Sequence, residues 1–189
     1  HDELSDLYML CKDKRAEEQI GQCIDLHRKW LAMDDRFERP HRDTTGYMMR
    51  AYAKMVYLRD LISRDKLNEY YQKCIGLARA RGDMAEIYST SARYYQCTGD
   101  YERAVAYIDS TITVYKSKGI KADLAPIYAT QSYLYEEMGD YKNALKAVRT
   151  TNNIRFNERV EEAQSSLAEM QTLFEVGRLE FEKSRLTGR

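Results

Sequence analysis

The sequence predicts an all-α protein in which antiparallel helix pairs are followed by one long C-terminal helix. Three observations support this fold class. The 189 residues include only 2 Pro and 9 Gly, so few residues interrupt helices. One stretch of the chain repeats itself after 40 residues, and the tail carries apolar residues at alternating steps of three and four. This combination is typical of stacked helix pairs.

The first element to justify is the internal repeat. Residues 98–104 read TGDYERA, and residues 138–144 read MGDYKNA. When the chain is shifted by 40 residues, ten of the 26 positions from 83 to 108 are identical. We therefore predict two clear repeats, over about 83–118 and 123–156, each folded as two helices.

Local residues explain where these helices begin and end. Asp83 followed by Glu86 has the spacing of a capping box, which starts a helix. Gly99 can adopt the left-handed conformation that ends a helix, and Asp100 can accept hydrogen bonds from the free N–H groups of the next one. The same Gly–Asp pair recurs 40 residues later. Each pair is thus a helix stop joined to a helix start.

Upstream of these units, the repeat pattern is weaker. Apolar residues at helical spacing predict a degenerate repeat over about 44–82. Another is predicted over about 3–33, with the polar stretch KDKRAEEQI (12–20) as its turn. The polar stretch DDRFERPHRDT (34–44) contains Pro40, so we expect a loop there. The array of repeats then covers residues 1–156.

The two clear units resemble tetratricopeptide repeats. The match rests on an aromatic residue near the start of each unit, a small residue and a tyrosine further along, and a small residue in the second helix: Tyr88 and Tyr128, Ala92 and Ser132, Tyr95 and Tyr135, Ala104 and Ala144. The period is 40 here and 34 in the consensus, so we expect longer helices. The resemblance implies a right-handed superhelix whose concave groove binds a protein or peptide.

The tail, residues 157–189, predicts one long helix with a heptad-like stripe. The members are Val160, Ala163, Leu167, Met170, Phe174, Gly177, Phe181 and Ser184. If the stripe pairs two chains as a coiled coil, the large residues form the seam of a homodimer: Val160, Leu167, Met170, Phe174 and Phe181. Alternatively, the helix covers the exposed face of the last repeat in its own chain.

Residues 165–186 also resemble the segment that follows the repeats in bacterial membrane-anchored signalling proteins. The match rests on Leu167 and Gln171, then Phe174 and Glu175. In that class, extracytoplasmic repeats continue into a membrane span, and a histidine kinase or DNA-binding output domain follows. The resemblance implies a periplasmic sensory region whose span lies outside this chain. The alternative is a free-standing cytoplasmic adaptor or peptide-responsive regulator.

The composition argues against other function classes. Lys plus Arg equal Asp plus Glu at 30 each, and a chain without an excess of basic residues is a poor binder of nucleic acid. The 3 His lack a second ligand at metal-binding spacing, and the 4 Cys match no zinc pattern. No phosphate-binding or nucleophile motif occurs. We therefore expect a binding module without cofactor or metal, and not an enzyme.

The repeat register also predicts which side chains line the groove. We expect polar and aromatic residues of the first helices on this side: Arg50, Lys54, Ser89, Arg93, Gln96, Tyr133 and Glu136. A tyrosine there offers contact area together with a hydroxyl, which suits peptide recognition. For each of these residues, an ordinary solvated helix face is the competing interpretation.

Overall fold

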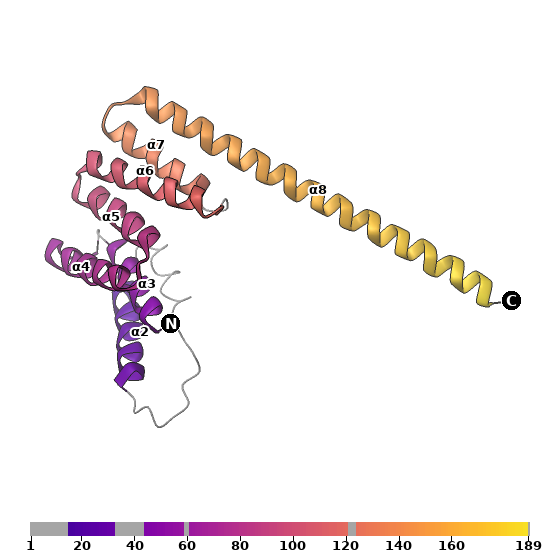
Figure 1. Ribbon diagram of the computed structural model, residues 1–189, viewed down its shortest axis with the longest axis horizontal. Helices are drawn as coiled ribbons and strands as arrows, with labels where there is room; N and C mark the ends of the chain where they lie inside the picture. The colour runs from indigo at the N-terminus through magenta and orange to yellow at the C-terminus, as the bar shows by residue number, and fades with distance from the viewer. Residues whose placement is uncertain (1–14, 33–43, 59–60, 121–123, 189) are drawn as a thin grey trace.

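The computed structural model describes residues 15–32, 44–58, 61–120 and 124–188 of the chain. Within these ranges the protein is all-α, with seven helices and no strand. Figure 1 shows them in order as α2 (Arg15–Ala32), α3 (Thr44–Val56), α4 (Arg64–Arg81), α5 (Met84–Thr98), α6 (Tyr101–Ser117), α7 (Leu124–Glu137) and α8 (Tyr141–Thr187). The predicted fold class, all-α, is confirmed at this level.

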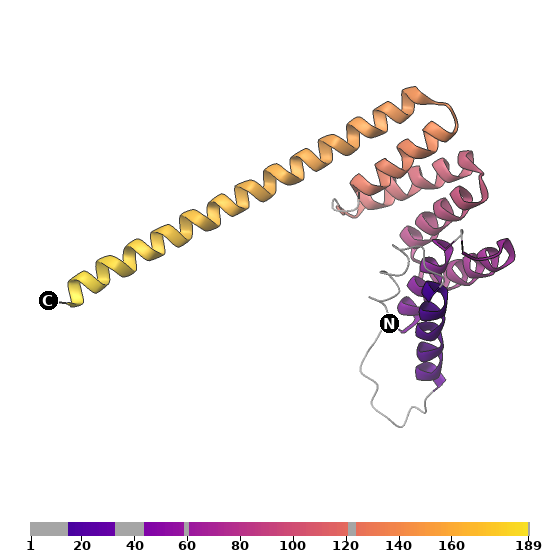
Figure 2. The ribbon, with the colours of Figure 1, turned by 180° about the vertical axis from the view of Figure 1, so that it is seen from behind.

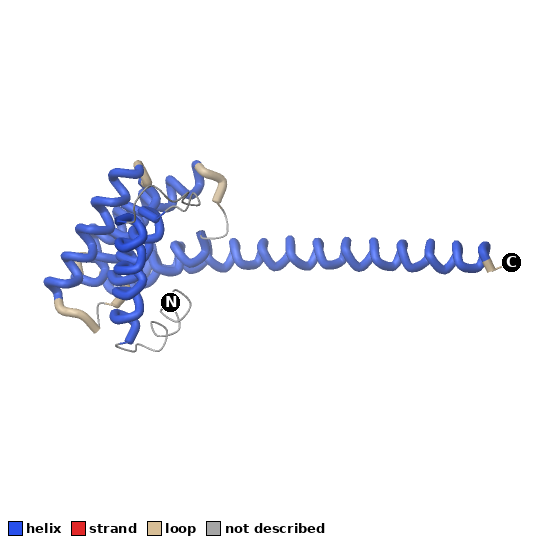
Figure 3. Tube along the Cα trace, turned by 90° about the horizontal axis from the view of Figure 1, so that it is seen from below, coloured by secondary structure: helices blue, strands red, loops and turns tan. Residues whose placement is uncertain are grey.

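Each helix packs against the next one along the chain, and short turns make neighbours antiparallel. The first six helices form a compact stack, and the beginning of α8 lies along α7 (Figure 1). The remainder of α8 leaves the stack as a single rod, as the views from behind and below show (Figures 2 and 3). With 47 residues, α8 is about 70 Å long.

The predicted Gly–Asp turns are confirmed. Gly99 ends α5 with a φ of 82°, and the Asp100 carboxylate accepts a hydrogen bond from the Arg103 N–H at 3.2 Å. Gly139 has a φ of 75°, and Asp140 caps α8 in the same way. A third turn of this kind joins α4 to α5, at Gly82 and Asp83. These turns hold four consecutive helices in tight succession.

Only half of the predicted capping box at the start of α5 is present. The Asp83 carboxylate accepts from the Glu86 N–H at 3.2 Å. The Asp83 N–H donates to the Ala78 carbonyl at 2.9 Å, so it does not need the Glu86 side chain. The Glu86 carboxylate instead accepts from the Thr90 hydroxyl at 2.5 Å, inside the stack. The prediction of a reciprocal box is therefore wrong.

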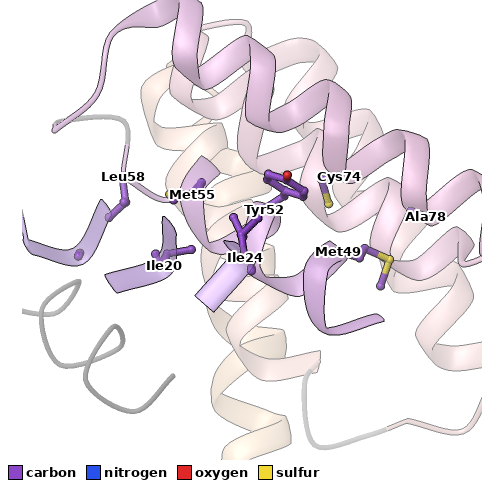
Figure 4. Close-up of a cluster of buried hydrophobic side chains, with 10 residues drawn as sticks. Ile20, Ile24, Met49, Tyr52, Met55, Leu58, Cys74 and Ala78 are labelled. Carbon is purple, nitrogen blue, oxygen red and sulfur yellow. The ribbon is translucent and has the colours of Figure 1, made fainter. Parts of the chain in front are cut away.

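The predicted turn at residues 12–20 is also wrong over its described part, because α2 begins at Arg15. Ala16, Ile20 and Ile24 share one helix face and are buried with residues of α3 and α4 (Figure 4). The Glu17 carboxylate accepts from the Lys66 ammonium at 2.6 Å and from the Tyr70 hydroxyl at 3.2 Å. These contacts to a segment about 50 residues away make the stretch helical. The apolar residues expected before it, Leu4, Leu7, Leu10 and Cys11, lie outside the described residues.

The core consists of two clusters of buried side chains. One joins α2, α3 and α4 around Ile20, Tyr52 and Met55 (Figure 4). The other joins α5, α6 and α7, with Ala104 and Leu134 at 0% exposed. In α8, burial is confined to the first turns, and every residue from Arg159 to Gly188 is exposed. The predicted boundary between residues 156 and 157 falls inside α8, where the helix continues without a break.

Candidate functional site

A pocket of about 190 Å³ opens between α5, α6 and α7. It brings together three of the predicted groove residues, Ser89, Arg93 and Gln96, because they recur along one face of α5. The remaining walls come from α6, α7 and the turn after α3: Ala92, Ile108, Thr111, Pro126, Ile127, Thr130 and Tyr57. The pocket is therefore mostly apolar with one cation at its side.

Arg93 is held in place by two contacts. Its guanidinium donates to the Gln96 side-chain oxygen at 2.9 Å and lies 4.1 Å from the centre of the Tyr57 ring. The second contact has the geometry of a cation–π interaction. One bond to Gln96 uses only part of the five N–H donors of a guanidinium. Arg93 can therefore bind an anionic or carbonyl group of a ligand while its position stays fixed.

The other predicted groove residues do not line this pocket. Arg50 is exposed and lies 4.7 Å above the Tyr47 ring, and Lys54 is half-buried on the same helix. Tyr133 is 39% exposed and Glu136 is also exposed. The α7 wall is built from Pro126, Ile127 and Thr130, so α7 presents a different face to α5 than a simple shift by 40 residues predicts.

Tyr57, Ile108 and Thr130 are lining residues that the sequence analysis missed. Tyr57 comes from the turn after α3, far from α5 in the sequence. No periodicity in the sequence marks such a residue, because its place depends on how α3 and α5 pack. Thr130 lies at a position that the repeat alignment assigned to packing.

Several tyrosines form a stacked row across α4, α5 and α6. The rings of Tyr71 and Tyr94 are 4.0 Å apart and nearly parallel, and those of Tyr95 and Tyr107 are 5.5 Å apart. The hydroxyls of Tyr71 and Ser91 share a hydrogen bond of 3.1 Å, and burial raises the pKa of Tyr71. Tyr94 and Tyr107, which fitted the core register poorly, thus pack between helices and do not face the pocket.

A buried polar cluster lies next to this row, at the interface of α4 and α5. The Cys74 thiol is 3.9 Å from the Glu86 carboxylate and 3.7 Å from the Thr90 hydroxyl. Burial raises the pKa of the Cys74 thiol to about 12, with the Glu86 charge adding to the effect. A thiol that stays protonated is a weak nucleophile. The cluster is therefore a packing contact and not a reactive site.

The predicted seam on α8 faces solvent. Val160, Leu167, Met170, Phe174 and Phe181 are all exposed, Phe174 at 75%. Leu167, Met170 and Phe174 border a shallow hollow together with Gln171 and Glu175. Within one chain, this stripe does not cover the last repeat, which was the alternative interpretation of the tail.

Two other features of the described ranges bear on function. They contain no group of three His, Cys, Asp or Glu side chains that could hold a metal ion. No helix in them is both long and apolar enough to cross a membrane. The backbone of His27 lies in α2, while His1 and His41 lie outside the described residues.

Comparisons with known proteins give one structural likeness. No protein-family model and no curated protein matches the chain. Among solved structures, the chain is similar to BtubC (BKLC) from P. vanneervenii, known from a crystal structure. The two share 15% sequence identity with a TM-score of 0.44, over 82% of this chain and 78% of that chain. A likeness this distant says nothing about function.

Proposed function

We propose that the chain is a tetratricopeptide-repeat-like module that binds a protein or peptide. The observation that carries the proposal is the pocket between α5, α6 and α7, where Ser89, Arg93 and Gln96 meet an apolar floor. A fixed cation beside apolar surface suits an extended peptide with an apolar side chain next to a carboxylate or carbonyl group. The three Gly–Asp turns support the repeat interpretation, because each ends one helix and starts the next in the same way.

The proposed setting is the periplasmic sensory region of a bacterial signal-transduction protein. It is supported by the resemblance of residues 165–186 and by the single long helix α8, which extends away from the stack (Figure 3). A rigid helix of this length can transmit a movement of the stack to whatever follows it. The second candidate is a free-standing adaptor, which the distribution of charge along α8 favours, as argued below.

Peptide binding is tested with a random peptide library displayed against the whole chain. Peptides enriched on the wild-type protein should bind Arg93→Ala about tenfold or more weakly, because a charged hydrogen bond and its packing are removed. Arg149→Ala, which removes an exposed arginine on α8, is the matched control and should bind normally. Equal affinity for both variants would place the binding surface elsewhere and reject the pocket.

The setting is tested on the full-length gene product. Membrane fractionation of tagged cells should find the protein in the membrane, with the repeats accessible from the periplasmic side. Recovery in the cytoplasm would support the free-standing adaptor. Neither outcome affects the peptide-binding test, so the two parts of the proposal can fail separately.

A further inference from the structure

The exposed apolar stripe of α8 begins much earlier than the predicted seam. Tyr141, Leu145, Phe156, Leu167, Phe174 and Phe181 are exposed, from 52% for Leu145 to 75% for Phe174. At about 100° per residue, these six side chains fall within an arc of about 80°. We name this face the outer stripe. It runs for about 60 Å, over both the packed and the projecting parts of α8.

The stack cannot cover the outer stripe. The side chains of α8 that are buried against α7 are Ala144, Ala147 and Thr151, centred about 130° away around the helix. The last helix of a repeat array normally has a polar outer face, since it meets water. Here that face carries large apolar side chains, so a partner must cover it.

The charges beside the outer stripe identify the partner. From residue 141 to 159, α8 has five basic residues and one glutamate, a net charge of +4. From residue 160 to 182, it has six glutamates and one arginine, a net charge of −5. Two copies side by side in the same direction would bring like charges together. Two copies in opposite directions bring opposite charges together along the whole stripe.

We propose that two copies of this chain pair through the outer stripe in an antiparallel manner, with the two-fold axis near residue 161, the midpoint of the stripe. Tyr141 then lies across from Phe181 of the second copy, and Phe156 from Leu167 of the second copy. The projecting half of each α8 covers the last helix of the other chain's stack. The tail thus caps an array, but the array of its partner.

The same register aligns individual charges on the flanks of the stripe. Lys146 lies across from Glu175 of the second copy, and Lys142 from Glu182 of the second copy, with each pair on one side of the helix. Arg159 lies across from Glu162 of the second copy on the other side. Two-fold symmetry doubles each of these contacts. Opposite charges in this position set the orientation of paired helices.

The inference deepens the proposed protein-binding function by naming a partner, and it does not rest on the α5–α7 pocket. It is independent of the membrane setting. Two chains anchored in one membrane just after residue 189 could not pair in opposite directions. Antiparallel pairing would therefore favour the free-standing adaptor, and the library test with Arg93→Ala remains a separate measurement.

Sedimentation at increasing salt tests the orientation on the unmodified protein. We expect a dimer at low salt whose dissociation constant rises roughly tenfold between about 0.05 and about 0.5 M NaCl, because salt screens attractive charges. A parallel pair would tighten with salt, since its charges repel. A monomer at all concentrations, or pairing that tightens with salt, would overturn the proposal.

A charge exchange gives a second, independent test. Lys146→Glu should weaken the dimer, and adding Glu175→Lys in the same chain should restore it. Glu169→Lys alone, on the inner side of the same helix, is the matched control and should leave the affinity unchanged. Loss of affinity without rescue would argue against the proposed register.

Cysteine cross-linking measures the register directly. In a chain whose native cysteines are replaced, Asn153→Cys mixed with Gln171→Cys should give cross-linked dimer, because the two sites face each other. Either variant alone should cross-link poorly, since its own two sites would be about 25 Å apart. Self-linking of each variant, without linking in the mixture, would demonstrate a parallel pair and refute the inference.

Discussion

The backbone conformation of Gly99 makes a quantitative prediction that a second glycine controls. Gly99 ends α5 at a φ of 82°, and a Cβ added there would meet no atom within 4 Å. Gly76 lies in the interior of α4, and its added Cβ would also meet nothing within 4 Å. Both residues are exposed. The same substitution, Gly to Ala, therefore differs between the two sites only in backbone conformation.

The two substitutions should change stability in opposite directions. An alanine in the left-handed region costs about 1–2 kcal/mol, so Gly99→Ala should lower the free energy of unfolding by that amount. An alanine inside a helix is about 0.5–1 kcal/mol better than glycine, so Gly76→Ala should raise it. For a chain of this size, about 1 kcal/mol corresponds to a change in Tm of about 2–4 °C.

Urea unfolding followed by far-ultraviolet circular dichroism measures both variants against the wild type. Gly99→Asn serves as a further control, because asparagine tolerates the left-handed conformation better than alanine and should lose less stability. If Gly99→Ala unfolded at the same urea concentration as the wild type or higher, the Gly99 turn would not constrain the array. The account of helix ends given above would then be wrong.

Four further changes have expected outcomes. Ala104→Leu adds atoms at a fully buried contact of α5 and α6 and should cost about 1–3 kcal/mol in a urea melt. Asp100→Ala removes the cap of α6 and should cost about 1 kcal/mol. Burial raises the pKa of Glu86 above its usual 4.5, so the folded state binds its proton more tightly than the unfolded state and is favoured as the pH falls toward 4.5. Glu86→Gln should abolish this part of the pH dependence and raise stability at neutral pH, which thermal melts across pH would detect. Phe174→Ala should weaken dimerisation in sedimentation while leaving the Tm of the stack unchanged, because Phe174 touches no helix pair in its own chain.

The sequence alone determined the features that depend on neighbouring residues. Gly99 and Asp100 set a helix end and a helix start through their own backbone and side chain, so the turn was predictable without knowing what surrounds it. Ser89, Arg93 and Gln96 share a helix face by their spacing, and that face reaches the pocket as expected. The length of the C-terminal helix followed from the absence of Pro and the regular apolar steps.

Tertiary structure decided the features that join distant segments. The stretch from Arg15 to Ile20 reads as a polar turn, yet Glu17 binds Lys66 and Tyr70, and those contacts fix it as helix. The side chain of Glu86 turns to Thr90 because Ala78 already accepts from the neighbouring N–H. The rotation of α7 replaced Tyr133 and Glu136 with other residues in the pocket wall. Local patterns set helix ends and faces, but only packing sets which faces meet, and so the outer stripe of α8 was recognisable only once α7 was seen to cover its other side.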